Sequence, residues 1–394
     1  MNISSPGRRT SASLRDDNRR RALTAIHLAG SEPVTRAALT RELGLTRATT
    51  GALVGDLVGR GLISEQPSAP TGTRGRPTTR LHPAPAGPVA VAVEIGVDAL
   101  TVAEVGLAGH RLGHTVTELA GATPSAVCDA LRPRLTAAHG RLGDRALGLG
   151  VAVYGLVDQA TGTVIQAPNL GWTDVPLRDV LRQAWPGPIM LDNDATLAGL
   201  GEARRAHPHA RSMLFLHSNV GLGGALVIDG QPVRGRRGFA GEFGHLPLAD
   251  HALPCHCGAT GCWELAVDQR ALARAAGRPD APHLAAATAR GILRDAARDD
   301  LECRTAVETV ARALGRGLGA LVNATDPDLV VVSAHAAQLL ERAPDVIASA
   351  MRSGAMAAHR DGLPPVVPSV LGDDGAILGA AEAVFAQTLL GRPR

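Results

Sequence analysis

One stretch of the sequence constrains the fold more than any other, because it places four candidate metal ligands close together. Residues 241–264 read GEFGHLPLADHALPCHCGATGCWE and contain three of the five cysteines in this 394-residue chain. Cys255, Cys257 and Cys262 lie within eight residues, and His245 lies ten residues before the first of them. Three thiolates and one imidazole suit a structural Zn²⁺, which prefers tetrahedral sulfur and nitrogen ligands. The stretch therefore predicts a zinc loop at residues 241–264.

Two alternatives to this ligand set stay open. His251 and His256 also lie beside the cysteines, so either could supply the imidazole in place of His245. The other alternative is a cysteine-rich loop that holds no metal. Metal binding is favoured because a reducing compartment keeps thiols from forming disulfides. Gly258 and Gly261 also allow the tight turn that brings the ligands to one centre.

The same stretch resembles the signature of the ROK family, which joins bacterial sugar kinases and sugar-responsive repressors. The resembling residues are Glu242-Phe-Gly-His245 and the following Cys-x-Cys-Gly-x-x-Gly-Cys-x-Glu, which ends at Glu264. In that family the histidine and the three cysteines hold zinc, and the two glutamates and the histidine contact sugar hydroxyls. The resemblance implies the same roles for Glu242, His245 and Glu264. Support of the zinc loop alone is the alternative role for the glutamates.

Charge is distributed unevenly along the chain. Residues 1–81 contain 13 arginines and 6 acidic residues, whereas the remainder contains 27 arginines and 31 acidic residues. A basic segment on an acidic body is typical of nucleic-acid binding. The chain has no lysine, which excludes Walker A phosphate loops and Schiff-base enzymes. Its eight aromatic residues argue against a reader of single strands that stacks bases.

The sequence also predicts where the protein resides. No apolar run is long enough to span a bilayer, and the first ten residues lack the apolar core of a signal peptide. We therefore expect a cytoplasmic protein with no membrane partner.

The basic segment has the pattern of a helix-turn-helix. Apolar residues at helical spacing predict a first helix near residues 14–28. Thr35 and Gly44 predict the start and the end of a second helix. Thr46 then caps a third helix, which reaches about Arg60 and has the position of a recognition helix in the major groove. We predict DNA contacts from exposed basic or hydrogen-bonding residues of the second and third helices, namely Arg36, Thr46, Arg47, Thr49 and Thr50.

A wing is expected after the third helix. Residues 62–64 are typical of a strand, and residues 74–81 of its returning partner. Arg74 and Arg76 flank a glycine, and such arginines suit an A·T-rich minor groove. A flexible linker rich in arginine and proline is the alternative for this segment. The segment resembles the winged helix that opens ROK repressors and that ROK kinases lack.

These patterns divide the chain into parts. We predict a winged helix-turn-helix domain over residues 14–81 and a stiff, proline-rich linker over residues 82–88. Residues 89–394 alternate apolar strand-like runs with helical patterns, which is typical of an α/β fold with covered sheets. The ROK resemblance implies that this part is a sugar-binding domain with a two-lobed, actin-like (ribonuclease-H-like) sugar-kinase fold.

The sugar side of the expected cleft is retained. Residues 167–172 match a family segment that lines the cleft, and Asn193-Asp194 matches the pair whose aspartate is the general base in the kinases. The resemblance therefore implies sugar contacts from Asn169, Asn193 and Asp194. A carboxylate can deprotonate a sugar hydroxyl or simply bind it. A role for Asp194 as the N-cap of the following helix is the alternative.

The motifs that bind the nucleotide in ROK kinases are altered in this chain. Where ROK kinases read Asp-x-Gly-Gly-Thr, residues 94–98 read Glu-Ile-Gly-Val-Asp. Val97 adds bulk where backbone amides would approach phosphate. Residues 218–225 match the second phosphate turn, but residues 333–335 read Ser-Ala-His where the family has glycines at the adenosine site. A chain that keeps the sugar side and loses the nucleotide side fits a sensor better than an enzyme.

Together these features favour a sugar-responsive transcriptional regulator, most simply a repressor. Its expected partners are a double-stranded DNA operator and a sugar or sugar derivative, and its expected cofactor is structural Zn²⁺. Paired half-sites imply a homodimer or homotetramer. No catalytic residue is expected, Asp194 being only the equivalent of the kinase base. An ATP-dependent ROK kinase with a fused DNA-binding domain is the alternative, and a DNA-binding architectural protein that has lost its ligand is a third hypothesis.

Overall fold

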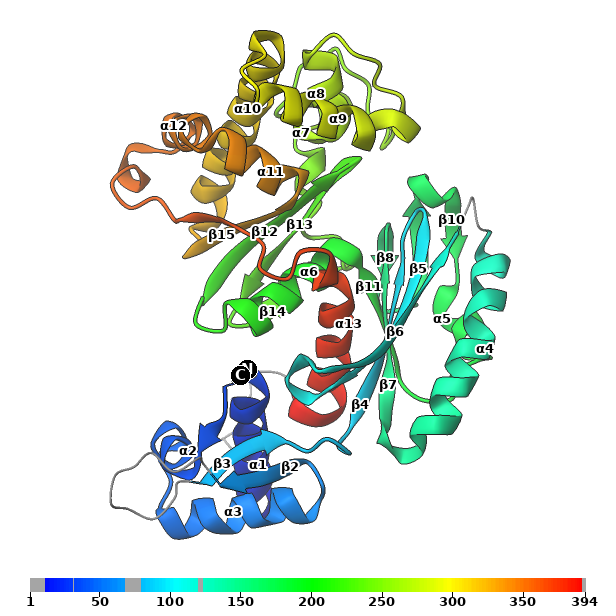
Figure 1. The fold of residues 1–394 in the computed structure, drawn as a ribbon, viewed down its shortest axis with the longest axis vertical. Coiled ribbons are helices and arrows are strands. Elements are labelled where there is room, and N and C mark those ends of the chain that lie inside the picture. Colours follow the sequence, from blue (N-terminus) through cyan, green and yellow to red (C-terminus); the bar gives the residue numbers. More distant parts are fainter. Residues whose placement is uncertain (1–10, 31, 68–78, 120–122, 392–394) are drawn as a thin grey trace, which may run out of the picture.

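The computed structural model describes residues 11–30, 32–67, 79–119 and 123–391. The N-terminal part is a unit of three helices and a small antiparallel sheet (Figure 1). Its helices are α1 (Ser11–Leu28), α2 (Arg36–Leu43) and α3 (Arg47–Gly59). Its sheet has the order β1 (Val34–Thr35), β3 (Thr79–Pro83) and β2 (Ile63–Pro67). This arrangement is the predicted winged helix-turn-helix, with β3 continuing two residues into the predicted linker.

Local hydrogen bonds explain where α2 and α3 begin and end. The Thr35 hydroxyl accepts a hydrogen bond from the Ala38 amide at 3.1 Å, and the Thr46 hydroxyl accepts one from the Thr49 amide at 3.2 Å. Gly44 follows α2 with a φ of 66°, a left-handed conformation that glycine adopts without a steric penalty. The caps are therefore those that the sequence predicts.

The first lobe of the body contains a five-stranded sheet in the order β11-β7-β4-β5-β6. Its strands are β4 (Val89–Ile95), β5 (Ala99–Gly106), β6 (Arg111–Glu118), β7 (Ala146–Val153) and β11 (Ile189–Asn193). β4 pairs antiparallel with β5 and parallel with β7. α4 (Pro124–Leu142) and α5 (Leu177–Leu181) share a core with one face of this sheet. A small sheet of β8 (Leu156–Asp158), β9 (Thr163–Ala167) and β10 (Trp172–Val175) lies beside them.

The second lobe repeats this plan. Its sheet has the order β14-β13-β12-β15-β16, with β12 antiparallel to β13 and parallel to β15. The strands are β12 (Ser212–Asn219), β13 (Gly221–Ile228), β14 (Gln231–Pro232), β15 (Leu329–Ala334) and β16 (Val366–Pro368). The helices are α7 (Glu264–Val267), α8 (Gln269–Ala275), α9 (Pro282–Ala296), α10 (Leu301–Thr325), α11 (His335–Arg342) and α12 (Pro344–Gly354). Two sheets of equal order and pairing are the expected actin-like, ribonuclease-H-like fold.

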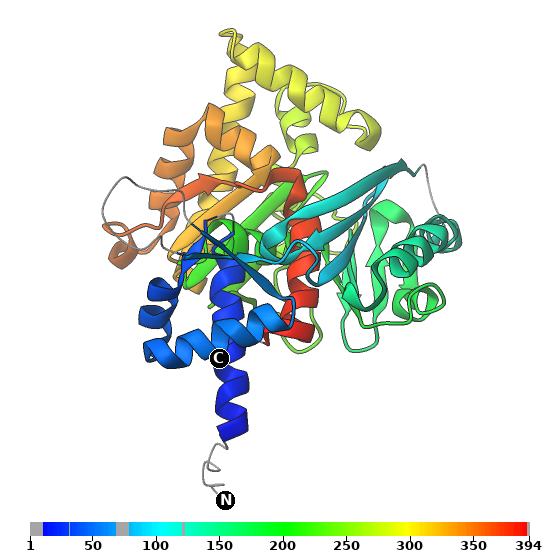
Figure 2. The same cartoon turned by 60° about the horizontal axis from the view of Figure 1, so that its bottom comes forward.

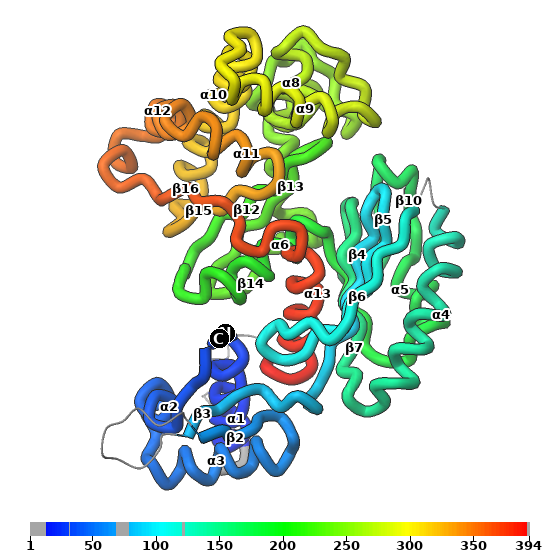
Figure 3. Tube along the Cα trace, viewed as in Figure 1, coloured from blue at the N-terminus to red at the C-terminus, as the bar shows by residue number. Residues whose placement is uncertain are grey.

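Two helices, α6 (Asp194–Gly201) and α13 (Gly375–Phe385), lie between the lobes (Figures 1 and 3). Their backbones come into contact where they cross. A Cβ on Gly201 would lie 2.7 Å from the Gly375 carbonyl oxygen, and a Cβ on Gly379 would clash with the Leu197 carbonyl. The glycines at this crossing therefore allow a closer approach than any side chain would.

The winged helix sits directly on the body. Leu23 and Ile26 of α1 are buried in the same apolar cluster as Val384 and Phe385 of α13, and Figure 2 shows α1 leading into this junction. The C-terminal helix packs on the first lobe as well, since Ala90 of β4 belongs to that cluster. In the described part of the chain, no helix is long and apolar enough to cross a membrane.

Candidate functional site

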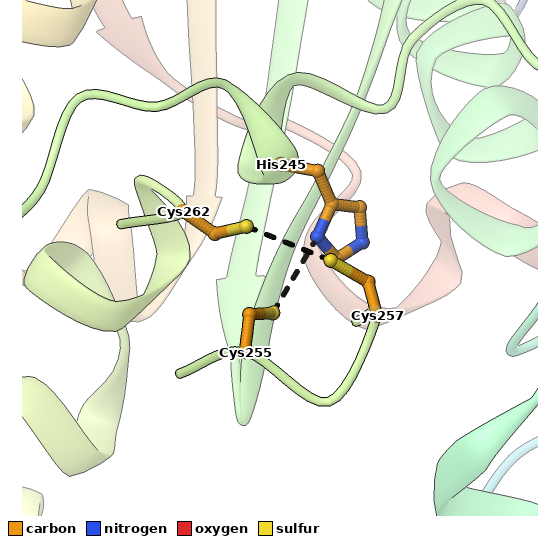
Figure 4. A group of neighbouring side chains, drawn as sticks. All are labelled: His245, Cys255, Cys257 and Cys262. Atoms are coloured by element: carbon orange, nitrogen blue, oxygen red, sulfur yellow. Dashed lines mark hydrogen bonds between the residues drawn. The ribbon is translucent and has the colours of Figure 1, made fainter. Parts of the chain in front are cut away.

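The predicted zinc loop brings its four candidate ligands together (Figure 4). His245 ends the short turn η5 (Phe243–His245), and its Nδ1 lies 3.8 Å from Cys255 Sγ. Cys257 Sγ and Cys262 Sγ are 3.6 Å apart. The loop turns back on itself because the Cys255 amide donates to the Ala259 carbonyl at 2.8 Å and because Gly258 and Gly261 have positive φ angles.

The separations of these side chains fit a tetrahedral metal ion. Four ligands at about 2.3 Å from a central Zn²⁺ lie about 3.8 Å from one another. The three thiols and the imidazole of His245 offer atoms that all lie within 4.8 Å of each other. These four residues could therefore hold a metal ion. Of the two alternative histidines, His256 groups with His245 and Glu264 in a second possible set, and His251 belongs to neither set.

The two glutamates of the loop lie against the same histidine. Glu264 starts α7 and is 5% exposed, and its Oε1 lies 3.8 Å from His245 Nδ1. The Cys255 thiol also donates to this oxygen at 3.0 Å. Glu242 Oε2 lies 3.7 Å from His245 Nε2. A metal bound through Nδ1 would leave Nε2 of the same ring facing Glu242, so the loop can hold a metal and present polar groups at once.

A cavity of ≈ 300 Å³ lies between the two lobes. Residues from both sheets and from the start of α13 line it, among them Glu94, Thr101, Tyr154, Asp194, His217 and Asp373. Asp194 is in this wall, and the charge of Glu242 helps to raise the pKa of Asp194, so Glu242 lies close enough to interact with it. Glu242, His245 and Glu264 of the loop, and Asn193, are absent from the residues that line the cavity. The cavity is rich in carboxyl groups, which suits ligands that carry several hydroxyls.

Asn193 holds Asp194 in place. The Asn193 side-chain oxygen accepts a hydrogen bond from the Thr196 amide at 3.0 Å, which makes Asn193 the N-cap of α6. Its side-chain nitrogen donates to the Gly155 carbonyl at 3.1 Å and to Asp194 Oδ1 at 3.0 Å. The capping role considered for Asp194 thus falls to its neighbour. The amide of Asn193 is fully used within the protein, so it positions the site instead of offering free groups to it.

Buried carboxyl groups dominate the electrostatics of the cavity. Burial, followed by the charge of Glu94, raises the pKa of Asp194 to about 8. Burial and the charge of Asp373 raise the pKa of Glu94 to about 7, against the hydrogen bond from Tyr154, which lowers it. Near neutral pH these groups can therefore both donate and accept hydrogen bonds.

Sequence reasoning missed part of the cavity wall. Tyr154, His217 and Asp373 line the cavity, yet each comes from the end of a separate element and belongs to no motif recognised in the sequence. The Gly372-Asp-Asp-Gly run was the available signal for Asp373. Asn169, in contrast, is exposed on η3 (Pro168–Leu170) and is absent from the residues that line the cavity.

The altered nucleotide motifs have visible structural consequences. Val97 is 36% exposed at the tip of the β4–β5 turn. Ala334, which ends β15, has a φ of 55° and a ψ of −125°, a conformation that glycine adopts easily and alanine does not. His335 follows it and is buried, with burial lowering its pKa to about 4.

The predicted DNA-contacting residues fall into three groups. Thr46, Arg47 and Thr49 are exposed around the start of α3, and the two threonine hydroxyls are 2.9 Å apart. The Arg36 guanidinium donates two hydrogen bonds of 2.8 Å to Glu65 of the wing strand β2. The positive charge of Arg36 is therefore already paired within the protein. Thr50 was expected to be exposed, but it is 0% exposed because it points into the core between the helices. Arg74 and Arg76 lie outside the described residues.

A model of the ROK family matches residues 90–387. The chain belongs to the ROK family. The match begins two residues after the end of the predicted linker, so the winged helix is an addition to the ROK domain. This agrees with the residues of the zinc loop, which first indicated the family.

ROK proteins of two kinds are similar to this chain. A glucokinase of Halalkalibacterium halodurans is 30% identical over 274 residues, which cover 66% of this chain and 82% of the glucokinase. The xylose repressor of Bacillus subtilis is 24% identical over 365 residues, which cover 90% of this chain and 92% of the repressor. A solved ROK family transcriptional regulator, a homologue of the Escherichia coli Mlc protein, has a TM-score of 0.76 at 24% identity and covers 96% of this chain and 98% of its own. The last match shows that the two proteins share a fold over nearly their whole length.

Proposed function

We propose that this ROK protein is a sugar-responsive DNA-binding regulator and acts as a repressor. The observation that carries the proposal is the winged helix-turn-helix, which shares a buried core with a two-lobed domain that holds an acidic cavity. A sugar kinase has no use for an exposed recognition helix. The similarity to a xylose repressor over 90% of this chain, against 66% for the glucokinase, supports the same function.

The DNA-binding part of the proposal rests on α3. Arg47 at its start is exposed, and the capped N-terminal turn also presents Thr46 and Thr49. The start of a recognition helix is the part that meets base edges in the major groove. Two such helices in a dimer would read half-sites about 34 Å apart, so we propose a homodimer or homotetramer. Arg74 and Arg76 keep the minor-groove role that their sequence predicts.

The sugar-binding part rests on Asp194, Glu242, His245 and Glu264, which bring carboxyl and imidazole groups to one region. A bound Zn²⁺ would supply a fixed positive charge that ties together the loop carrying three of them. The ligands would be His245, Cys255, Cys257 and Cys262. The protein's own contribution is to keep Asp194 and the glutamates oriented toward sugar hydroxyls, with Asn193 positioning Asp194.

A second candidate function is that of an ATP-dependent sugar kinase, and the buried Asp194 favours it. A carboxyl whose pKa is about 8 is a competent general base once it is ionised. Against it stand Val97 at the first phosphate turn and the strained Ala334 at the adenosine site. Both place side chains where a kinase needs bare backbone, so we favour the sensor.

Titration calorimetry on the zinc-loaded protein separates the two functions. The probes are D-glucose, D-xylose and D-glucosamine, each with and without ATP and Mg²⁺. Heat from a sugar without heat from ATP, and without phosphorylated sugar by mass spectrometry, is the expected result. ATP binding accompanied by phosphorylated product would show that the protein is a kinase.

A further inference from the structure

A buried polar cluster joins the winged helix to the body, and no role assigned above uses it. Its members are His27 on α1, Glu382 on α13, and Arg204 and Arg205 on the π-helical turn η4 (Glu202–Ala206). His27 is 0% exposed and Glu382 is 1% exposed. These four residues are here named the junction cluster, and they lie beside the apolar residues that α1 and α13 share.

His27 is held by three different elements of the body. Its Nε2 lies 3.0 Å from both carboxylate oxygens of Glu382 on α13. The amide of Ala108, in the turn η1 (Leu107–Gly109), donates to its Nδ1 at 3.0 Å. Arg205 on η4 donates to its backbone oxygen at 2.8 Å. Because Nδ1 accepts, the ring proton lies on Nε2 and is donated to Glu382.

The charges of the junction cluster depend on one another. Arg205 Nε lies 2.9 Å from Glu382 Oε1, and Arg204 Nη1 lies 3.6 Å from Glu382 Oε2. Buried charges are stable only while they are paired and hydrogen-bonded. A shift of one helix would therefore leave several buried polar groups without partners at once. The cluster thus favours one defined position of α1 relative to the body over a continuous range of positions.

Each element that holds His27 either borders the cavity between the lobes or directly continues an element that does. α6 starts at Asp194 in the cavity wall and continues directly into η4. At about 1.5 Å per residue, the helical stretch of residues 194–206 spans about 18 Å from the cavity to the junction cluster. α13 begins just after Asp373 of the cavity wall, and β5 contributes Thr101 to the wall before it leads into η1.

The two helices cannot shift independently of each other. They cross at Gly201 and Gly379, where no side chain separates the backbones. Tightly packed interiors transmit a displacement because they hold no free volume to absorb it. A ligand that draws the lobes together acts at the cavity ends of α6 and α13, and the displacement reaches their other ends at the junction cluster.

We infer that the junction cluster couples binding of a ligand in the cavity to the position of α1 relative to the body. It thereby couples ligand binding to the position of the recognition helix α3. This inference rests on the proposed function, because it requires a ligand in the cavity and DNA on α3. The cluster acts by positioning α1 and contacts neither the ligand nor the DNA. Its four residues are absent from the cavity wall and from α3.

The test compares Arg205→Gln and His27→Gln with a matched control, Arg145→Gln. Arg145 donates to the Gly87 carbonyl at 3.0 Å, so it also ties the segment after the winged helix to the body, but it lies outside the junction cluster. The DNA probe is a duplex selected by the wild-type protein from a random pool, and the sugar probes are D-glucose and D-xylose. The duplex Kd is measured with and without sugar, and the sugar Kd is measured without DNA.

The expected result is a loss of coupling with binding preserved. Sugar should change the duplex Kd of the wild type and of Arg145→Gln by about fivefold or more, and that of both cluster variants by less than about twofold. The sugar Kd should stay within about twofold in all four proteins, since the cluster does not touch the cavity. Circular dichroism checks folding, and Arg205→Lys, which retains the charge, replaces a variant that fails to fold.

Two outcomes would count against the inference and can be told apart. Folded cluster variants that respond to sugar as strongly as the wild type would overturn the coupling role and leave the regulator intact. A wild-type protein that selects no duplex, or whose duplex affinity ignores every sugar that it binds, would overturn both the proposed function and the coupling.

Discussion

At the scale of single residues, Asn193 carries more of the site than its motif suggests. Its amide caps α6, binds the Gly155 carbonyl and orients Asp194. We predict that Asn193→Ala lowers the free energy of unfolding by about 1 kcal/mol through loss of the cap and weakens sugar binding as well. Asn193→Ser keeps a capping oxygen without setting a carboxylate against Asp194, and it should recover part of the stability. Urea denaturation and calorimetry measure the two effects, and full stability in Asn193→Ala would contradict the capping role.

The ionisation of Asp194 gives the cavity a characteristic pH dependence. Its pKa of about 8, and that of about 7 for Glu94, lie above the values of free carboxyl groups. Folding therefore takes up protons, and these groups reduce stability progressively as pH rises from about 4 to about 8. We predict that Asp194→Asn raises the free energy of unfolding more at about pH 8.5 than at about pH 5. Urea denaturation at both pH values measures this, and an equal gain at the two would be inconsistent with a neutral, buried carboxyl.

Residue identity was predictable where a motif or a local pattern specifies it. The four candidate metal ligands were predictable because thiols at that spacing have few other uses, and the structure brings His245 close to the three cysteines. Thr50 was misplaced because small polar residues at the start of a helix occur on either face, and only the packing of α1 against α3 decides which. Arg36 was predicted without its partner, since Glu65 lies 29 residues away on the wing.

At the scale of elements, we propose that α3 is the recognition helix on which DNA affinity depends. We predict that Arg47→Ala weakens duplex binding by about 1 to 3 kcal/mol if the side chain reads a base. Arg60→Ala, at the far end of the same helix and paired with Asp56 at 2.9 Å, is the matched control and should change affinity little. Fluorescence anisotropy with the selected duplex measures both. Equal losses would assign Arg47 a general electrostatic role.

We propose that sugar binding depends on the predicted zinc loop. We predict that Cys257→Ser lowers the zinc content, as measured by mass spectrometry under native conditions, and weakens sugar binding at least tenfold, because the loop no longer fixes Glu242 and Glu264. Duplex affinity without sugar should persist. Cys128→Ser changes a buried thiol of α4 outside the loop and is the control. Zinc retained at full stoichiometry in Cys257→Ser would remove this thiol from the ligand set.

Elements were predicted well where their signals are local. Caps, glycine stops and apolar spacing placed the helices of the winged helix within a few residues. The junction cluster gave no such signal. His27 and Glu382 are 355 residues apart, so no local pattern pairs them, although a single glutamate in the apolar sequence of α13 is unusual.

At the scale of the whole molecule, the fold links three regions in one continuous structure. Figure 3 shows α6 and α13 between the lobes; both helices contribute residues to the cavity wall, and they cross at Gly201 and Gly379. Glu382 of the junction cluster lies on α13, and Arg204 and Arg205 lie on η4, which continues α6. Within the junction cluster, His27 is the residue whose protonation state matters most near neutral pH. Its pKa is lowered, chiefly by burial, although Glu382 opposes the shift. Burial opposes the ionised form of Glu382 too, but His27 and the two arginines lower its pKa to about 2.

The signs of these shifts predict how the domain junction responds to acid. The unfolded state protonates histidine below about pH 6.5, whereas folded His27 resists protonation, so the stability of the junction falls as pH drops below that value. The stabilisation that Glu382 provides is present above about pH 4.5 and is lost only as pH falls from about 4.5 to about 2. Protonation of His27 would also place an N–H on Nδ1, which could then no longer accept the hydrogen bond from the Ala108 amide. We predict that hydrogen exchange in α1, corrected for its intrinsic rate, accelerates relative to α10 between pH 7 and pH 5 in the wild type and not in His27→Gln. The same acceleration in the variant would place the acid-sensitive group elsewhere.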